Sequence, residues 1–588
     1  MGAINLAHSP DANQGVTSYG PSLWPTERVV QCREFARIIP PAAGKDTFMS
    51  IDDHPPTGLS RRDLLTRAAT GFAVMAGASI GSIAFQSENP LAAQSAPSGD
   101  LVLVNGKFVD GRGEVATTLT IRNSRIAGVG KTAPLAPDAR TIDLGGRTVI
   151  PGLFDGHVHY TRAAVNPGYE ARRIERAFSI AELQEAIAER AKSVPPGAFI
   201  TCIGGWNYNQ FTEQRRPTKA ELDAAASKHG VYISGTGGGT GAITNSVGVA
   251  FFESKGVAVD SRTGAVTSAP AALAALQGVQ TPEDKLRGTA ELNAHANSLG
   301  LTGVINGGNL DDQEFALRLW REDKLTIRMR PLFPADSPQQ VETRVLNNFS
   351  QGGRAVGDDL FRVAGFGERI GGTDTMSSQF EPTARMIAKY GWLLQQHSIT
   401  IKENDFHLQV FQSIAREHPI GKMRWSIIHL QSIDDGRLKT LKDLGAGASA
   451  QTWTYFSIGG GPPFRRIVDS GIPAAVGTDS TNVSALDPWL SLFYMVTGRN
   501  VTGQLTNDGQ QISRVEALRL YTEGAAWFSF DDHQVGSFVE GKYADLAVLS
   551  QDYLTVPDRM IRKIESVMTL VGGKMVHASG PFTTIPRT

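Results

Sequence analysis

Two histidines separated by one residue, His157 and His159, are the strongest chemical signal in the sequence. They follow the apolar run 149–154 and are preceded by a Pro-Gly pair and an Asp-Gly pair. Side chains two positions apart on a β-strand point to the same face, so both imidazoles can reach one metal ion. A strand can also carry two surface histidines by chance, so further ligands are needed to indicate a metal site.

Two further histidines follow later strand-like segments. His397 comes directly after the apolar run 392–396, and His429 directly after the run 425–428. In barrels of alternating strands and helices, catalytic groups gather where the strands end. Either histidine alone would be interpreted as a hydrogen-bonded core residue, but together with the first pair they favour metal ligation. The remaining histidines are assigned to the leader, to predicted helices with solvated side chains, and to the C-terminal part: His8 and His54; His229, His295, His407 and His418; His533 and His577.

Two carboxylates also stand at the ends of predicted strands, as these histidines do. Asp479 ends the segment 473–479, the last strand of the series, where it can ligate a metal and take or deliver a proton. Glu368 closes an earlier strand and is a second candidate ligand. The alternative for Glu368 is an ion pair with Arg369 or another neighbour, and the two interpretations are almost equally favoured.

A mixed set of imidazoles and carboxylates suits zinc, with manganese, iron or cobalt as alternatives. One or two divalent ions fit the number of candidate ligands. A bound ion lowers the pKa of water from about 16 to about 7, so hydroxide is available at neutral pH. Asp479 is then the expected catalytic base. Trp206, Tyr208 and Gln451 are candidate substrate contacts, and each is equally consistent with simple packing.

The middle of the chain alternates between strand-length apolar runs and longer helical patterns, clearest at 180–191 and 282–299. Repeated strand–helix pairs predict an α/β fold with a parallel sheet, and eight of them would close into a (β/α)₈, TIM-like barrel. An open doubly wound sheet is the alternative, but no G-x-G-x-x-G follows an early strand. The strand-length runs are 198–203, 301–305, 361–366, 392–396, 425–428, 446–450 and 474–476.

Residues 99–149 and the C-terminal residues 531–588 are both rich in predicted short strands broken by glycine turns. We therefore predict one small β-sandwich built from residues 99–149 and 531–588, around a barrel of residues 150–530. Insertions at 205–280 include a hairpin at 256–268 and would lie at the barrel mouth. The glycine-rich run 235–241 lacks the Gly-Lys-Ser/Thr of a phosphate-binding loop and is interpreted as a flexible loop.

The first hundred residues differ from the rest. The pair Arg61-Arg62 precedes the moderately apolar run 68–85 and a small-residue stretch at 91–94. This order predicts a twin-arginine export signal over residues 49–98, and hence a periplasmic or secreted bacterial protein that engages the twin-arginine export machinery. An amphipathic helix or an uncleaved anchor is the alternative. Residues 1–48 are interpreted as a non-native upstream extension, with translation starting at Met49.

Composition excludes several classes of function. Lys and Arg number 57 against 58 Asp and Glu, so the net charge of -1 gives no basic surface for a nucleic acid. The two cysteines, Cys32 and Cys202, exclude a structural disulfide framework. A small molecule is the expected substrate, and the sequence gives no oligomeric state.

These residues together resemble the amidohydrolase superfamily. The resemblance rests on Pro151-Gly152 with the two paired histidines and on the later ligand candidates. It also rests on residues 536–549, which are similar to the segment by which the chain returns from the barrel to the β-sandwich in that superfamily. Within the superfamily the chain is most similar to the amidohydrolase family 3, or YtcJ-like, branch. The short sequence motifs that support this similarity are Gly205-Trp206-Asn207, residues 217–223, Asn245-Ser246, Arg424-Trp425 and Gln451. The resemblance implies a metal-dependent hydrolase acting on an amide, cyclic amide or ester bond.

The chain departs from this branch at three places. The branch usually has a carboxylated lysine on the fourth strand that bridges two metals, and residues 362–367 supply none. Glu368 is the expected replacement; otherwise the site would hold one metal. A glycine run stands where a histidine usually precedes Asn245-Ser246, and His429 is preceded by Ile428 where glutamate is typical. A lyase, decarboxylase or isomerase on the same barrel, or a binding protein without catalysis, is therefore the alternative function.

Overall fold

The computed structural model describes residues 100–133, 137, 139–236, 241–308, 313–347 and 357–586. The predicted export signal at 49–98 and the upstream extension lie outside the described residues. So do positions 237–240, which form most of the glycine-rich run. The predicted domain boundaries stay predictions.

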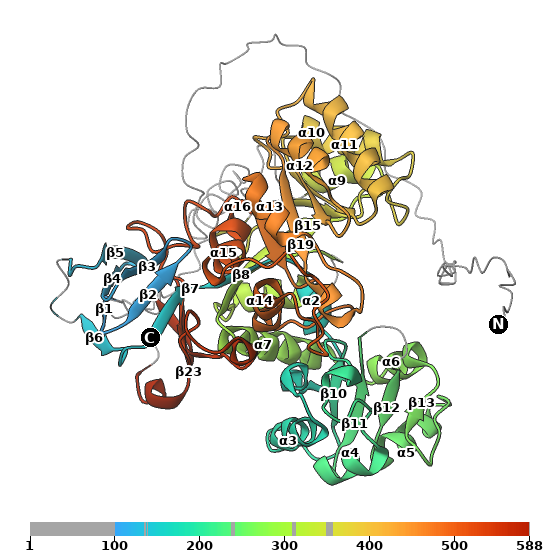
Figure 1. Cartoon of the computed structure of the whole chain (residues 1–588). Helices are drawn as coiled ribbons and strands as arrows, with labels where there is room; N and C mark the ends of the chain where they lie inside the picture. The colour runs from blue at the N-terminus through green and yellow to red at the C-terminus, as the bar shows by residue number, and fades with distance from the viewer. Residues whose placement is uncertain are drawn as a thin grey trace, which may run out of the picture. The chain divides into compact units, whose positions relative to one another are not determined.

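Eight parallel strands form the central sheet (Figure 1). Backbone and side-chain bonds join its last strand to its first, since the Asp479 N–H donates to the His157 carbonyl (3.0 Å) and the Thr478 hydroxyl donates to Asp155 (2.6 Å). The sheet therefore curls into the predicted barrel, not an open doubly wound sheet. In spatial order the strands are β8 (Leu153–Val158), β14 (Leu301–Asn306), β15 (Arg328–Phe333), β16 (Gly365–Glu368), β17 (Leu393–Ser398), β18 (Ser426–His429), β19 (Gly447–Gln451) and β20 (Ala474–Gly477).

Amphipathic helices connect these strands, and polar caps fix where several of them begin. The helix α7 begins after Thr281, whose side chain accepts from the Asp284 N–H while the Asp284 carboxylate accepts from the Thr281 N–H. Thr400 and Glu403 repeat this capping box at α11. The barrel helices are α2 (Tyr160–Ala164), α7 (Pro282–Ser298), α8 (Glu314–Arg321), α9 (Pro338–Asn347), α10 (Phe380–Lys389), α11 (Ile401–Ala415), α12 (Asp435–Asp443), α13 (Phe464–Ser470), α14 (Pro488–Thr497), α15 (Arg514–Arg519) and α16 (Ala525–Trp527).

A β-sandwich combines the two ends of the described chain, as predicted. Its two sheets have the strand orders β5-β4-β1-β6 and β23-β22-β21-β7-β2-β3, so β7 lies between an N-terminal and a C-terminal strand. Leu103, Phe108, Leu546 and Leu570 are among the fully buried side chains of its core. Its elements are β1 (Leu101–Val104), β2 (Lys107–Asp110), β3 (Gly113–Ala116), β4 (Leu119–Arg122), β5 (Arg125–Val129), β6 (Arg140–Asp143), β7 (Thr148–Pro151), β21 (Leu546–Leu549), α17 (Asp558–Ile561), β22 (Ser566–Val571) and β23 (Lys574–Ala578).

An inserted unit with its own five-stranded sheet separates β8 from α7. The run 198–203 was expected in the barrel, and this is wrong: it forms β10, which pairs in parallel with β9 and β11 of the inserted sheet. An apolar run marks a buried strand but does not identify its sheet. The expected hairpin at 256–268 is confirmed by an antiparallel bridge between Val259 and Val266. The inserted elements are β9 (Tyr169–Glu170), α3 (Ile180–Ala191), β10 (Phe199–Ile203), α4 (Lys219–Ala225), β11 (Gly230–Ser234), β12 (Ala242–Thr244), α5 (Ser246–Ser254), β13 (Ala265–Val266) and α6 (Ala269–Gln277).

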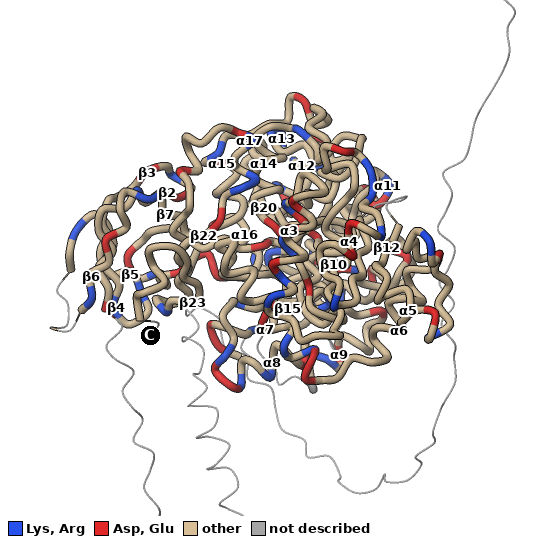
Figure 2. The backbone as a smooth tube through the Cα atoms, turned by 90° about the horizontal axis from the view of Figure 1, so that it is seen from below, with Lys and Arg blue, Asp and Glu red and all other residues tan. Residues whose placement is uncertain are grey.

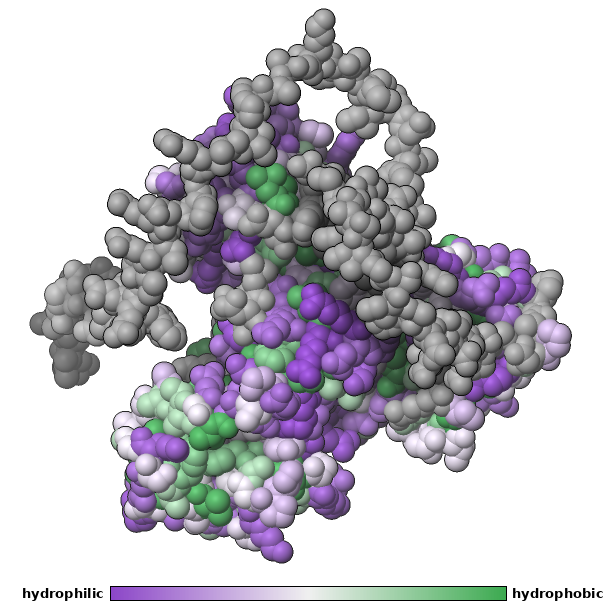
Figure 3. All heavy atoms as spheres, turned by 180° about the vertical axis from the view of Figure 1, so that it is seen from behind, coloured by the Kyte–Doolittle hydropathy of each residue, from purple (hydrophilic) through white to green (hydrophobic). Residues whose placement is uncertain are grey.

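Acidic and basic residues are interspersed along the described chain, with no long run of one sign (Figure 2). On the face drawn in Figure 3, apolar patches are most evident on the inserted unit at the lower left, and hydrophilic residues cover much of the remainder. Within the described ranges, no helix combines the length and the apolar character needed to cross a membrane.

Candidate metal centre

Six predicted ligands meet at the ends of the barrel strands. His157, His159, Glu368 and Asp479 form one group whose potential ligand atoms all lie within 4.8 Å of one another. Glu368, His397 and His429 form a second such group. Four of these residues belong to β8, β16, β17 and β18; His159 directly follows β8, and Asp479 comes two residues after the end of β20. The fold thus brings together residues that are up to 322 positions apart, and Glu368 belongs to both groups.

The first group surrounds one oxygen of Glu368. Its Oε2 lies 2.8 Å from Nε2 of His157 and 3.2 Å from Nε2 of His159. Oδ1 of Asp479 lies 3.2 Å from the same His159 nitrogen and 3.9 Å from that of His157. Two imidazole nitrogens and two carboxylate oxygens therefore converge on one small volume, which is a donor set typical of a divalent transition metal.

The second group surrounds the other oxygen of Glu368. Oε1 lies 3.3 Å from Nδ1 of His397, and that nitrogen lies 2.7 Å from Nε2 of His429. The two carboxylate oxygens are thus divided between the two groups. Arg369 also approaches Oε1, with its Nε at 3.5 Å, so the expected ion pair is present beside the histidine contacts.

Hydrogen bonds behind the first pair of histidines decide which ring nitrogen faces the site. Nδ1 of His157 lies 2.9 Å from Oε1 of Gln395, and Nδ1 of His159 lies 2.9 Å from the Gly307 carbonyl. Both partners are acceptors, so both Nδ1 atoms donate to them and both Nε2 atoms face the carboxylates, where a metal would take the place of a proton. Sequence reasoning missed Gln395 and Gly307. Gln395 could have been found, because it lies two residues before His397 and so shares a strand face with it.

The backbone at two candidate ligands is in the left-handed region, with φ of 80° at His429 and 58° at Asp479. Non-glycine residues adopt this conformation only where the surrounding structure holds them. Gln451 supplies part of that support, because its Oε1 accepts the His429 backbone N–H. Gln451 is fully buried, and its expected role in substrate binding stays a prediction.

A cavity of about 680 Å³ opens over the ligand groups. Besides candidate ligands its lining includes Arg162, Trp453 and Val483, which the sequence did not point to, and Arg369, which the sequence offered only as an ion-pair partner of Glu368. Trp206 and Tyr208 are not among the described residues that line it. Trp206 lies in the core of the inserted unit, stacked on Phe211, and the predicted substrate contacts of both residues stay predictions.

Burial and mutual contacts set the charge states of the cluster. Burial alone would raise the pKa of Glu368, but hydrogen bonds from His157, His159 and His397 lower it well below its usual range. Burial alone would also raise the pKa of Asp479, but contacts with His159 and His429 lower it. Burial lowers the pKa of His429 to about 3. The carboxylates are therefore anionic and His429 is neutral, as metal binding requires. Burial would lower the pKa of His157 and His159, but the same carboxylates raise both, that of His159 to about 9, so a metal would have to displace a proton from each of these rings.

Three of the histidines expected to be solvated are buried instead, either wholly or, for His295, at ring nitrogen Nε2. His229 is 6% exposed and His407 is fully buried. On α11, Nε2 of His407 donates to the Thr375 carbonyl (2.8 Å), and burial lowers its pKa to about 4. The expectation was wrong because a position within a helix does not show which face turns toward the barrel.

Comparison with known proteins agrees with this geometry. The family model described as "Amidohydrolase family" matches residues 140–577, about three quarters of the chain. The chain belongs to the amidohydrolase family. This member is 23% identical to the N-substituted formamide deformylase of Arthrobacter pascens, over 81% of its own length and 97% of the relative. It is 21% identical to the putative amidohydrolase YtcJ of Bacillus subtilis, over 75% of its length and 91% of that protein.

Solved structures of similar proteins show the same fold. A metal-dependent hydrolase from Pyrococcus furiosus matches 78% of this amidohydrolase and 100% of its own chain, with a TM-score of 0.53 and 21% identity. The atrazine chlorohydrolase TrzN from Arthrobacter aurescens TC1, a structure complexed with zinc, matches 81% of the amidohydrolase and 95% of its own chain, with a TM-score of 0.50 and 14% identity. The predicted barrel with an added sandwich is thereby confirmed. The cluster of histidines and carboxylates is consistent with a divalent metal.

Proposed function

We propose that this amidohydrolase holds two divalent ions bridged by Glu368 and hydrolyses an amide, cyclic amide or ester bond of a small molecule. The observation that carries the proposal is the division of the two Glu368 oxygens between two groups of ligand atoms. The C–N bond is favoured because the relative from Arthrobacter pascens is named a deformylase of N-substituted formamides.

The donor set fits such a pair of ions. His157, His159 and Asp479 would hold one ion together with Glu368, and the other ion would take His397, His429 and the second Glu368 oxygen. Imidazole and carboxylate donors suit zinc, and manganese, iron and cobalt are the alternatives. The zinc in the chlorohydrolase structure supports this choice.

The protein groups around the cluster provide the remaining chemistry. Bound divalent ions supply Lewis-acid polarisation and bring the pKa of water to about 7. Asp479 is anionic and 6% exposed at the cavity wall, so it accepts the proton of the attacking water and passes it to the departing nitrogen or oxygen. Trp453 and Val483 offer the apolar wall against which the rest of a substrate can pack.

Metal analysis tests the bridging arrangement. Protein purified without chelator is expected to hold about two divalent ions per chain by mass spectrometry, and Glu368→Gln is expected to lose at least one of them together with turnover. His157→Ala should lose metal as well. His533→Ala is the matched control, because that side chain is 67% exposed and outside the cluster. A folded wild-type protein without metal would contradict the proposal and favour the non-catalytic binding protein.

A substrate panel tests the reaction. N-substituted formamides, cyclic amides, esters and lactones are incubated in ¹⁸O-labelled water with and without chelator, and products are identified by mass spectrometry. One oxygen from water in the acid product, lost with chelator, is the expected result. Turnover without incorporation of label would instead support a lyase, decarboxylase or isomerase on the same barrel.

We also propose that the protein is exported by the twin-arginine route to the periplasm or beyond. The pair Arg61-Arg62 before an apolar run supports this. Cell fractionation of the wild type and of a variant with both arginines changed to lysine tests it. Equal export of the two forms would contradict the proposal.

A further inference from the structure

The loop that connects β20 to α14, residues 478–487, is called here the Asp479 loop. It carries Asp479 near its start, and its exposed residues Asn482 and Val483 line the cavity over the metal cluster. The left-handed backbone of Asp479, with φ of 58°, persists only where surrounding contacts hold it. The position of this loop therefore determines both a candidate ligand and a part of the cavity wall.

The inserted unit contacts the loop two residues after Asp479. Gly204, which directly follows β10, has φ of 71°, and a Cβ atom there would overlap the carbonyl oxygen of Thr481. The Thr236 hydroxyl donates to the same carbonyl oxygen (3.5 Å). Glycine at position 204 is thus required twice, by its backbone conformation and by the close approach of the loop.

A buried carboxylate of the inserted unit binds the far end of the loop. Glu175 lies in the 3₁₀ helix Arg172–Arg176 and is 1% exposed. Its Oε2 accepts the backbone N–H groups of Leu486 (2.9 Å) and Asp487 (3.1 Å). Arg176 donates from Nε to the Asp487 side chain (2.7 Å), which also caps α14. The loop is therefore bound to the inserted unit at two separate places.

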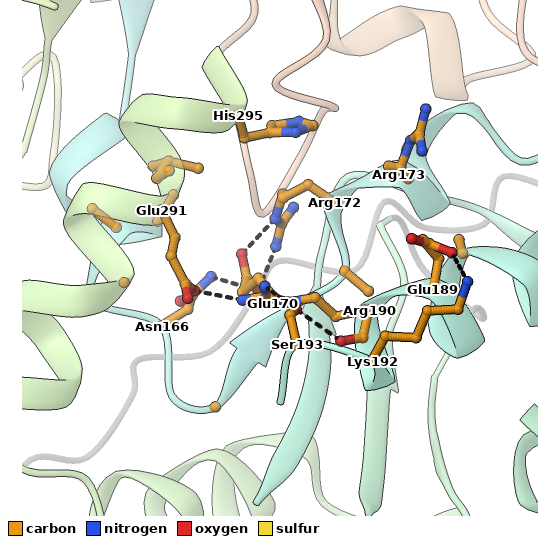
Figure 4. A pocket seen from close by; sticks show the side chains of 17 residues that line it. Asn166, Glu170, Arg172, Arg173, Glu189, Arg190, Lys192, Ser193, Glu291 and His295 are labelled. Carbon is orange, nitrogen blue, oxygen red and sulfur yellow. Dashed lines mark hydrogen bonds and ion pairs between the residues drawn. The ribbon is translucent and has the colours of Figure 1, made fainter. Parts of the chain in front are cut away.

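Arg172 connects these two places within the inserted unit. Its Nη1 donates to Oε1 of Glu175 (2.8 Å), and its Nη2 donates to the Ile203 carbonyl (2.9 Å), one residue before Gly204. Figure 4 shows the same arginine beside Glu170, which accepts from Nη2 (2.6 Å) in the pocket drawn there. The carboxylate that binds the loop is thus fixed to the strand end that contacts Thr481.

The sequence motif Gly205-Trp206-Asn207, which the proposed hydrolysis does not use, belongs to this arrangement. A Cβ atom at Gly205 would overlap Oε1 of Glu175. The Gly205 N–H donates to the Thr236 hydroxyl (2.7 Å), and Nδ2 of Asn207 donates to the Thr236 carbonyl (3.0 Å). The motif therefore places both Glu175 and Thr236 against the loop.

We propose that Gly204 and Glu175 are positioning residues through which the inserted unit holds the Asp479 loop, and with it the Asp479 carboxylate and the cavity wall at Asn482 and Val483. The proposal rests on the proposed function only for the part that Asp479 takes in metal binding and hydrolysis. The contacts themselves join the inserted unit to the loop whether or not a metal is bound.

Hydrogen–deuterium exchange of the metal-loaded protein, measured by mass spectrometry on peptides from 478–490, tests the far end. Glu175→Met keeps the side-chain length but removes the acceptor, so the Leu486 and Asp487 amides should exchange about tenfold faster or more. Glu175→Gln keeps one carbonyl oxygen and should restore part of the protection. Burial raises the pKa of Glu175 to about 7, so exchange is measured at about pH 8, where the carboxylate is ionised.

Glu516→Met is the matched control for this end. Glu516 on α15 also accepts a backbone N–H, that of Ser513, and pairs with Arg465. Its replacement should leave the exchange of the Asp479 loop unchanged.

Gly204→Ala tests the near end. Its methyl group must displace Thr481, so the amides of 480–483 should exchange about tenfold faster or more. The visible absorption spectrum of protein loaded with cobalt(II), which reports the geometry of the ligands, should change as Asp479 shifts. Gly197→Ala is the matched control, because Gly197 also has a left-handed backbone, with φ of 84°, but a Cβ atom there meets open space.

The outcomes separate this proposal from the proposed function. Wild-type exchange in Glu175→Met, or equal effects of Gly204→Ala and Gly197→Ala, would overturn the positioning role. Faster exchange with an unchanged cobalt(II) spectrum in both Glu175→Met and Gly204→Ala would also overturn it, because Asp479 would then not depend on the inserted unit. Wild-type protein that binds no cobalt(II) would refute the metal centre instead, and the exchange rates would still decide whether the inserted unit holds the loop.

Discussion

Glu368 provides a carboxylate where the YtcJ-like branch usually has a lysine that must be carboxylated. Its two oxygens already face separate groups of imidazoles, so in the proposed two-metal site the bridging carboxylate would need no carbon dioxide to form. We expect metal loading of the wild type to be the same in bicarbonate-depleted and bicarbonate-rich buffer. In Glu368→Lys, loading should become dependent on bicarbonate. Metal content by mass spectrometry after reconstitution measures both, and bicarbonate dependence in the wild type would contradict the role of Glu368.

Gln395 is a positioning residue, because it fixes the His157 ring through Nδ1 and, among the described residues, hydrogen-bonds to no other candidate ligand. Gln395→Met keeps the side-chain volume but removes the acceptor. Loss of such a partner typically weakens metal binding 10- to 100-fold, and we expect a decrease of that size in competition with a chelator. Gln412→Met on the exposed face of α11 is the control. If both variants bound metal like the wild type, the hydrogen bond would have no orienting role.

The residue types and positions of the ligands could be predicted from the sequence because each stands at the end of an apolar strand-length run. That rule found His397, His429 and Asp479 although their neighbours in space are far away in the chain. It could not find Gly307, since a backbone carbonyl has no residue-specific signal. It also could not show that Gln451 faces the His429 backbone, because amide side chains serve packing, support and substrate binding alike.

At the scale of elements, the alternation of strands and helices predicted the barrel but not the full extent of the insertion. Strand β10 has the length and apolar character of a barrel strand, and only its pairing with β9 and β11 places it elsewhere. Pairing partners are non-local, so periodicity within one segment does not contain them. The helices were easier to locate, because caps such as Thr281 and Thr400 are local signals.

The cap of α11 makes one part of the stability dependent on pH. Burial alone would raise the pKa of Glu403, but hydrogen bonds from Thr375 and Thr400 hold it at about 2, below its ordinary value of 4.5. A carboxylate with a depressed folded-state pKa stabilises fully above its unfolded pKa and loses that effect as the pH falls through the folded pKa. The stabilisation is therefore complete above about pH 4.5 and disappears toward pH 2.

Glu403→Gln tests this element. Its deficit in unfolding free energy should be constant above about pH 5 and shrink as the pH falls below about 4.5. The expected size is about 1–2 kcal/mol, because solvent reaches part of this carboxylate and reduces the effect of the full shift. Thr375→Val, which removes one donor, should show a smaller pH-dependent deficit. Urea unfolding at several pH values measures both, and a deficit that grows on acidification would contradict the assignment.

At the scale of the whole molecule, buried arginines of the barrel bind carboxylates near the C-terminal end. Arg328 on β15 donates to both oxygens of Asp545, which directly precedes the sandwich strand β21. Arg330 binds Asp531 in the same way. These pairs join positions 217 and 201 residues apart. The sequence could not predict them, because charged residues near the ends of strands are ordinarily solvated.

The Arg328–Asp545 pair should be a major determinant of the attachment of the sandwich to the barrel. Both side chains are 1% exposed, so removing one partner leaves a charge buried with only Asp359 to compensate it. We expect Asp545→Leu to lower the free energy of unfolding by about 3–5 kcal/mol. Asp443→Leu is the control, because its pair with Lys439 is exposed and contributes less than about 1 kcal/mol.

The double variant Arg328→Met with Asp545→Leu separates the cost of an unpaired buried charge from the loss of the attachment itself. Replacing both charges by apolar side chains removes the desolvation cost as well as the attraction, and often leaves stability nearly unchanged. We therefore expect the double variant to recover most of the stability that Asp545→Leu loses in urea unfolding. If it remained as unstable as the single variant, the directional bonds of the pair, and not the burial of an uncompensated charge, would be what holds the sandwich on the barrel.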